Sequence, residues 1–214
     1  MFAAMKTIIF DFDGTLADTL DMLVEVVNQL LKEANRPILT DQDVTKLRGM
    51  NIQGVMRYLK VPFRMLPQLV NKVRKMLTNR ATNLKPIPGI VEVIKQLSKD
   101  GHKLGVVSSS SKETINTFLK ANGLQDSVTF IDAGLGLLSK SRSLKSCLRK
   151  HQLDPSQTIY VGDEVRDIEA ARAAGLPIIS VAWGLNTRTL LETKRPDHLL
   201  DKPAELLKLS QASS

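Results

Sequence analysis

The sequence has little of what disulfide-stapled, membrane-spanning or base-stacking proteins need. Its one cysteine, Cys147, excludes an intramolecular disulfide, which is typical of a reducing compartment. No run approaches the roughly 18 apolar residues of a membrane-spanning helix. Aromatic residues make up only 4% of the chain, so few side chains are suited to stacking on bases. The first residues lack the basic start of a secretory signal, so we expect a cytoplasmic protein with no membrane partner.

The charge is strongly unbalanced but not concentrated. The formal net charge is +8 and the sequence pI is about 9.6. A basic excess occurs in proteins that bind nucleic acids, and also in proteins that attract anionic metabolites. Lysine and arginine are spread along the chain, and the densest stretch, residues 140–150, fits the solvated face of a helix. We therefore expect no nucleic-acid partner. The sequence does not indicate the oligomeric state.

Five short apolar runs predict the buried strands of a parallel sheet. They are rich in valine and isoleucine and do not alternate with polar residues, as expected where both faces of a sheet are covered. Helical patterns lie between them, and this alternation predicts an α/β fold with a doubly wound parallel sheet. The predicted strands span residues 6–11, 103–108, 128–131, 158–161 and 178–182, and the predicted helices span residues 89–99, 112–121, 141–150 and 166–174.

The alternation is interrupted by a long helical insert. Apolar positions recur at helical spacing through residues 22–34 and 66–80, and two shorter helical patterns lie between them at residues 41–47 and 52–59. An insert of this kind after the first strand indicates a small second domain. We predict a core made of residues 1–18 and 85–214, and a helical cap made of residues 19–84.

The end of the first predicted strand carries the run DFDGT. Asp11 and Asp13 are two positions apart, so both would point to one face if the strand continued. Adjacent carboxylates repel each other and favour a divalent cation, and oxygen ligands select a hard ion such as Mg²⁺. Gly14 permits a sharp turn. Taken alone, the run is explained equally well by a strand that enters an Asp-Gly turn.

Four motifs together resemble those of the haloacid dehalogenase superfamily, specifically its phosphatase branch. The first is DFDGTLADT at residues 11–19, and the second is the apolar strand LGVVSS at residues 104–109. Lys140 resembles the third motif, although many relatives have proline where this chain has Ser141. VGDEVRDIEAA at residues 161–171 resembles the fourth, GDxxxD. The resemblance covers roughly residues 6–207 and implies a Rossmann-like core with an inserted helical cap, as in the phosphoglycolate phosphatase-like branch.

The resemblance implies a role for each acidic motif residue. Asp11 would be the nucleophile that forms an aspartyl-phosphate, and Asp13 would be the general acid and base. Asp11, Asp13 through its backbone carbonyl, and Asp163 would hold Mg²⁺. Asp167 would act at one remove, through metal-bound water or by orienting Lys140. A direct contact of Asp167 or Glu164 with the metal stays open.

The remaining motif residues would bind the phosphoryl group. The resemblance gives Lys140 a contact with both a phosphoryl oxygen and the Asp11 carboxylate. Ser108 would donate its hydroxyl, and Ser109 or Ser110 would share this work. In the cap, residues 48–51 form a helix–loop–helix junction where Arg48 would grip a carboxylate or a second phosphate of the substrate. A solvent-exposed arginine beside a turn explains Arg48 equally well.

The resemblance implies a Mg²⁺-dependent hydrolase of small phosphorylated metabolites. Asp13 excludes the dehalogenases and the phosphonate-cleaving relatives, which lack this second aspartate. The expected substrate is phosphoglycolate-like or a sugar phosphate. A phosphosugar mutase of the β-phosphoglucomutase type would keep the same residues and is one alternative. A non-catalytic regulatory or binding protein on the same fold is another, which the basic charge weakly motivates.

Overall fold

Short apolar segments form the strands of one parallel sheet, and this sheet positions the candidate functional residues. The computed structural model describes residues 6–134 and 140–211. Six strands lie in the order β5–β4–β1–β6–β7–β8, and every neighbouring pair is parallel. These strands are β1 (Thr7–Phe10), β4 (Lys103–Val107), β5 (Phe130–Asp132), β6 (Thr158–Gly162), β7 (Ile178–Val181) and β8 (His198–Leu200).

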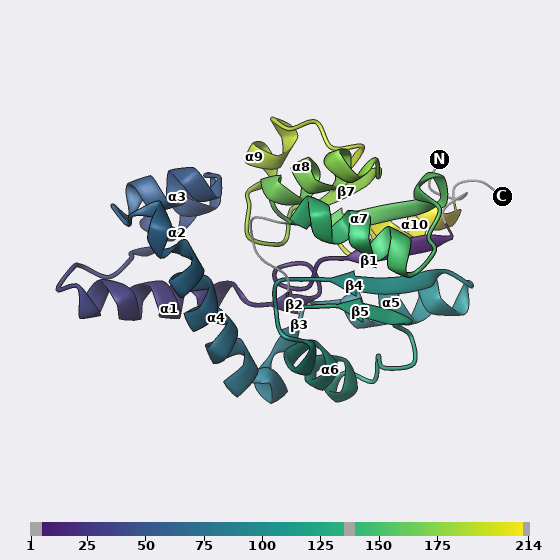
Figure 1. Ribbon diagram of the computed structural model, residues 1–214, viewed down its shortest axis with the longest axis horizontal. Helices are drawn as coiled ribbons and strands as arrows, with labels where there is room; N and C mark the ends of the chain where they lie inside the picture. Colours follow the sequence, from purple (N-terminus) through teal and green to yellow (C-terminus); the bar gives the residue numbers. More distant parts are fainter. Residues whose placement is uncertain (1–5, 135–139, 212–214) are drawn as a thin grey trace.

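Helices cover both faces of the sheet, as its uniformly apolar strands require. Along β1, Ile8 and Phe10 face one side and Ile9 faces the other, because side chains alternate along a strand. The first side packs on α5 (Ile90–Lys99), α6 (Lys112–Ala121) and α10 (Glu205–Gln211). The second side packs on α7 (Lys140–Lys150), α8 (Val165–Ala174) and α9 (Arg188–Glu192), and Figure 1 shows α7 and α8 opposite α5 and α6. The predicted α/β doubly wound parallel sheet is confirmed.

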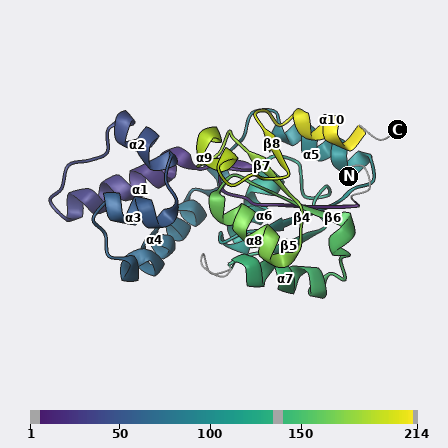
Figure 2. The same cartoon turned by 90° about the horizontal axis from the view of Figure 1, so that it is seen from above.

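Four helices lie to one side of this sandwich (Figures 1 and 2). They are α1 (Leu20–Glu33), α2 (Asp41–Arg48), α3 (Ile52–Tyr58) and α4 (Leu66–Asn79). The chain leaves and returns through two short antiparallel strands, β2 (Ala17–Asp18) and β3 (Lys85–Pro86). Short 3₁₀ turns complete the chain at Phe63–Met65, Ala81–Asn83 and Pro155–Gln157. The division into a core and a cap at residues 19 and 84 stays a prediction.

The sequence patterns did not indicate β8, α9 or α10. β8 has three residues, and α9 and α10 have five and seven, so none is long enough to display a clear period. Within residues 6–134 and 140–211, no helix is both long and apolar enough to cross a membrane.

Candidate active site

The predicted functional residues meet at the carboxyl ends of β1 and β6. These strands are neighbours, yet they belong to opposite halves of the winding, because the chain runs outward from β1 to β5 before it crosses back to β6. Ligands of open α/β sheets bind at such a switch point. Asp11 follows β1 directly, and Asp163 follows β6 directly. The topology therefore brings together two aspartates that are 152 positions apart.

Asp11 is a buried carboxylate with a cation against it. Its side chain is 2% exposed. Its Oδ1 accepts a hydrogen bond from the Phe12 backbone N–H at 2.8 Å, and its Oδ2 lies 2.5 Å from Nζ of Lys140. Burial raises the pKa of Asp11 to about 7, because the charge of Lys140 offsets only part of the cost of desolvation. An added cation beside Asp11 would favour its ionised form.

Lys140 opens α7 and holds two carboxylates at once. Its Nζ donates to Asp11 and also to Asp167, and its side chain is 8% exposed. Burial alone would lower the pKa of Lys140, but the charges of Asp11 and Asp167 outweigh it, so the pKa lies above its ordinary value. Lys140 is therefore a fixed positive charge beside Asp11.

Asp163 is held rigidly by donors from two loops. Its Oδ1 accepts from the Thr15 hydroxyl at 2.7 Å, and its Oδ2 accepts from the Leu185 backbone N–H at 2.7 Å. Gly14 has φ +74°, and a Cβ at this position would overlap the Asp163 carboxylate. The glycine of DFDGT is thus required both by its backbone conformation and by the close approach of Asp163.

Three aspartates could share one cation. Asp11, Asp163 and Asp167 each offer a carboxylate oxygen, and these oxygens all lie within 4.8 Å of one another. All three side chains are buried, and burial with the nearby acids raises the pKa of Asp163 well above its ordinary value. An all-oxygen, anionic donor set of this kind fits a hard divalent ion such as Mg²⁺. The residues present therefore suit the predicted metal.

Asp167 also organises the start of α8. Its Oδ2 accepts from the Glu164 backbone N–H at 2.9 Å, and its Oδ1 accepts from Lys140. Both oxygens are thus engaged by protein donors, and the role of Asp167 in orienting Lys140 stays a prediction. A carboxylate oxygen of Asp167 also lies within 4.8 Å of oxygens of Asp11 and Asp163. A direct contact of Asp167 with the metal therefore stays open as well.

Asp13 lies apart from the three clustered aspartates, beside the loop that follows β4. Its Oδ2 accepts from the Ser110 hydroxyl at 2.7 Å. Its Oδ1 is buried and has no hydrogen-bond partner among the described residues. Burial raises the pKa of Asp13, and the Ser110 hydrogen bond opposes that rise. A carboxyl group with an elevated pKa and one unpaired oxygen is suited to donating a proton.

The serine loop after β4 lies beside the same centre. Ser108 is 1% exposed, and its Oγ accepts from the Ser110 backbone N–H at 3.0 Å. The carbonyl of Ser109 accepts from Nε of Arg74 in α4 at 2.9 Å. Of the serines named for this loop, Ser110 is the one whose hydroxyl contacts Asp13, and the phosphoryl-binding roles of Ser108 and Ser109 stay predictions.

Arg48 connects the helical insert to the loop after β7. Its Nη2 donates to the Gly184 carbonyl at 2.9 Å and its Nε donates to the Leu185 carbonyl at 3.2 Å. Its own carbonyl accepts from the Thr187 backbone N–H at 3.0 Å. The predicted contact of Arg48 with substrate stays a prediction. The contacts of its guanidinium that are seen here join the insert to the sheet.

Asn186 strengthens this connection and was not singled out by any sequence pattern. It is 7% exposed. Its Nδ2 donates to the carbonyls of Arg48 and Met50, both at 3.2 Å, and its Oδ1 accepts from the Val165 N–H at 2.9 Å. One side chain therefore joins the insert to the first turn of α8, the helix that carries Asp167.

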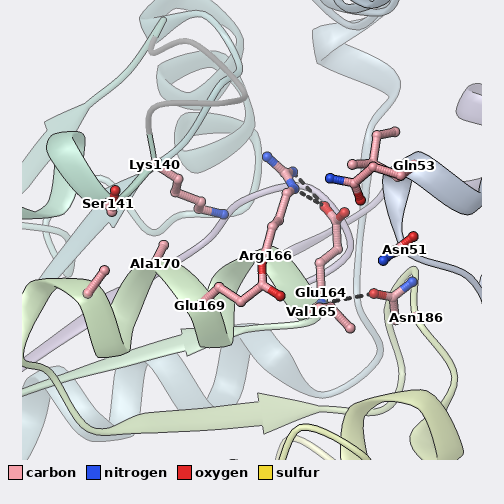
Figure 3. Close-up of a pocket in the computed structure, with 12 residues that line it drawn as sticks. Asn51, Gln53, Lys140, Ser141, Glu164, Val165, Arg166, Glu169, Ala170 and Asn186 are labelled. Atoms are coloured by element: carbon pink, nitrogen blue, oxygen red, sulfur yellow. Dashed lines mark hydrogen bonds and ion pairs between the residues drawn. The ribbon is translucent and has the colours of Figure 1, made fainter. Parts of the chain in front are cut away.

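A polar cavity of about 390 Å³ opens between the insert and α8 (Figure 3). Lys140 lines it, and Figure 3 shows Asn51 and Gln53 facing Arg166 and Glu164 across it. Arg166 donates to Glu164 from Nη2 at 2.5 Å and from Nε at 2.8 Å. The pairing outweighs burial and keeps the pKa of Arg166 well above its ordinary value. Residue type alone did not identify Arg166, which the GDxxxD pattern leaves unspecified.

Fold and site together define an α/β enzyme with a carboxylate-rich centre at its switch point. The chain belongs to the haloacid dehalogenase-like hydrolase family, whose model matches residues 8–181. It is an enzyme of the family's phosphatase type.

Individual relatives agree with this assignment. The chain is 34% identical to a phosphoglycolate phosphatase of Synechococcus elongatus, over 95% of this chain and 96% of that protein. It is 26% identical to the pyrophosphatase PpaX of Bacillus mycoides, over 95% of each chain. A haloacid dehalogenase-like hydrolase from Streptococcus pneumoniae has the same fold, with a TM-score of 0.80, 22% identity, and coverage of 97% of this chain and 99% of that one.

Proposed function

We propose that the protein is a Mg²⁺-dependent phosphohydrolase that cleaves small phosphate monoesters through an aspartyl-phosphate on Asp11. One observation carries the proposal: the buried Asp11 carboxylate lies against Lys140 and within 4.8 Å of Asp163 and Asp167. A carboxylate with an adjacent cation and further anionic oxygen ligands is the arrangement that phosphoryl transfer by a carboxylate nucleophile requires. Asp11, the backbone carbonyl of Asp13, and Asp163 would hold Mg²⁺, which would neutralise charge on the transferring phosphoryl group.

In the first step, a carboxylate oxygen of Asp11 attacks phosphorus and forms the O–P bond of the aspartyl-phosphate. The bond from phosphorus to the ester oxygen breaks, and Asp13 gives its proton to that oxygen, so the alcohol leaves neutral. In the second step, Asp13 takes a proton from water as the water oxygen attacks phosphorus. Asp11 is released as a carboxylate, with inorganic phosphate as the product.

Lys140 and the serine loop bind the phosphoryl group in this proposal. Lys140 places a positive charge beside Asp11 and the phosphoryl oxygens, and Asp167 orients it. Ser108 and Ser109 donate hydrogen bonds to the phosphoryl oxygens from hydroxyl and backbone groups. Donors fixed before the reaction stabilise the developing charge without reorganising during it.

The helical insert, residues 19–84, acts as the cap that closes over the site and excludes water. The relatives include a phosphoglycolate phosphatase and a pyrophosphatase, so both support a small phosphorylated substrate for this chain. In the proposal Arg48 joins the cap to the core. Its predicted contact with a substrate anion is a second role, which the variant Arg48→Ala tests.

A turnover screen tests the proposal. Phosphoglycolate, pyrophosphate, several sugar phosphates and p-nitrophenyl phosphate are each incubated with the protein and Mg²⁺, and inorganic phosphate is measured. We expect release that depends on Mg²⁺ and stops with EDTA. Formation of an isomerised sugar phosphate without net phosphate release would instead indicate a mutase. Turnover that is unchanged by EDTA would contradict the metal-dependent mechanism.

A further inference from the structure

A second cavity adjoins the site, and its wall is mostly aliphatic, with Glu164, Arg166 and Arg74 among the polar residues that also line it. It has a volume of about 200 Å³ and is lined by residues of α1, α3 and α4 together with residues of the core. Its wall includes Leu23 and Val27 of α1, Ile52 and Val55 of α3, and Val70 of α4. All five side chains are partly exposed rather than buried, so this apolar surface is not used up by packing within the cap.

Asp13, the proposed general acid, connects this cavity with the proposed reaction. Asp13 lines the aliphatic cavity, together with Ser109 and Ser110 of the serine loop. The wall of the polar cavity in Figure 3 includes Lys140 but, among the described residues, not Asp13. A proton donor must lie within hydrogen-bond reach of the oxygen that it protonates. An alcohol protonated by Asp13 would therefore have the aliphatic cavity within reach.

The two cations among the described residues in the wall of this cavity, Arg166 and Arg74, already have anionic or carbonyl partners. Arg166 is paired with Glu164, and Nε of Arg74 donates to the Ser109 carbonyl. A small anionic leaving group would have to compete with these partners, while the aliphatic wall would give it no hydrogen bond. An apolar leaving group meets no such cost and gains from burial of its surface.

We propose that the aliphatic cavity is a leaving-group subsite, and that it selects phosphate monoesters whose alcohol carries an aliphatic body. The inference rests on the proposed phosphohydrolase function and on the role given there to Asp13. In this assignment the alcohol occupies the aliphatic cavity. The polar cavity, whose wall includes Lys140, lies on the side of the residue that is proposed to bind the phosphoryl group.

A homologous series of n-alkyl phosphates, from methyl to hexyl, tests the subsite. The leaving alcohols have similar acidity, so their kcat/KM values compare binding of the chain rather than bond cleavage. We expect kcat/KM to rise by up to about fourfold for each buried methylene until the cavity is full. The n-alkylphosphonates, which cannot be hydrolysed, are measured in parallel by calorimetry, and their affinity is expected to follow the same trend.

Variants of residues in the cavity wall test whether the dependence of kcat/KM on chain length arises in this cavity. The double variant Val27→Thr with Val70→Thr keeps side-chain shape and adds hydroxyl groups, so the dependence on chain length is expected to shrink towards none. Val44→Thr in α2 is the matched control, because Val44 is a cap valine outside the cavity wall, and it is expected to keep the wild-type dependence. Thermal melting confirms that each variant is folded.

The outcomes separate this inference from the function on which it rests. Hydrolysis of the series with no dependence on length, or a preference for phosphoglycolate over butyl phosphate, would overturn the subsite and leave the phosphohydrolase intact. Hydrolysis of neither the alkyl esters nor phosphoglycolate nor p-nitrophenyl phosphate would overturn the proposed function, and the phosphonate affinities would still decide the subsite. A length dependence that survives in the double variant would place the apolar contact elsewhere and overturn this assignment.

Discussion

Nζ of Lys140 lies 2.5 Å from Oδ2 of Asp11, in an ion pair whose side chains are 8% and 2% exposed. Asp167 contacts the same ammonium group, so one lysine is shared by two buried carboxylates. Buried ion pairs contribute little net stability, but the loss of one partner leaves a buried charge uncompensated. Loss of Lys140 should therefore destabilise the site and also remove the residue that is proposed to bind the phosphoryl group.

Lys140→Met is expected to reduce both activity and stability. Loss of the charge should lower kcat by about 10²–10³-fold. It should also cost about 3–5 kcal/mol in the free energy of unfolding at pH 7.5 without metal, because Asp11 and Asp167 lose their counter-charge. Steady-state kinetics and urea unfolding measure the two effects. Lys145→Met is the matched control on the exposed face of α7 and is expected to change neither. Wild-type kcat in Lys140→Met would remove Lys140 from the mechanism.

Metal binding is expected to stabilise the protein most above neutral pH. The pKa of Asp11 is raised from 3.8 to about 7, so the folded state keeps a proton that the unfolded state releases. Without metal, stability therefore falls as pH rises from about 4 to 7. Saturating Mg²⁺ should restore it, raising Tm by roughly 5–10 °C at pH 7.5 when Mg²⁺ is about 100 times Kd. The increase at pH 5 should be smaller, because protons compete for the carboxylates.

Two aspartate variants locate this stabilisation. Asp163→Asn should abolish the Mg²⁺-induced rise in Tm, whereas Asp126→Asn, at an exposed acidic residue that belongs to no candidate metal cluster among the described residues, should keep it. Differential scanning calorimetry measures both without any substrate. An equal rise in the two variants would mean that the stabilising Mg²⁺ binds elsewhere.

Asn186 and Arg48 are expected to affect substrate affinity through the position of the cap. Asn186→Ala removes hydrogen bonds to Arg48, Met50 and Val165, and Arg48→Ala removes those to Gly184 and Leu185. Each variant should raise KM by a similar factor for every substrate, with a smaller effect on kcat. A rise in KM that Arg48→Ala shows only for substrates with a second anionic group would instead support the predicted contact of Arg48 with substrate.

Cys147 is expected to be chemically inert in the folded protein. Burial and the adjacent Asp132 raise its pKa to about 12, so the thiolate is scarce at pH 8. Ellman's reagent should therefore react with Cys147 only after unfolding. Since the folded state favours the neutral thiol, this contribution to stability should be complete below about pH 9 and should decline as pH rises towards 12. Rapid labelling of the native protein at pH 8 would contradict this environment for Cys147.

Residue patterns predicted the strands and helices well where the elements are long or fully buried. The predicted helix at residues 112–121 coincides with α6, and the predicted strand at residues 103–108 differs from β4 by one residue. The patterns missed β8, whose three residues HLL are too few to show a period. That strand is placed by pairing with β7 at the sheet edge rather than by any preference of its own.

The site was predictable as far as its motifs reach. Asp11, Asp163 and Lys140 were named from their patterns, and the topology brings them together. The sequence could not indicate Asn186 or Arg166, because an isolated asparagine or arginine has many possible environments. Their roles depend on which backbone groups the folded loops leave beside them. The aliphatic cavity likewise depends on how α1, α3 and α4 face Asp13, which helical periodicity does not determine.

Trapping the covalent intermediate decides whether Asp11 is the nucleophile. The protein is mixed with a turned-over substrate and Mg²⁺, quenched in acid within milliseconds to seconds, digested, and analysed by mass spectrometry for an acid-stable, base-labile phosphoryl group. We expect the label to lie on Asp11, and we expect Asp11→Asn to fold normally, carry no label and show no turnover. A label on another residue, or wild-type turnover by Asp11→Asn, would contradict the role of Asp11 as the nucleophile.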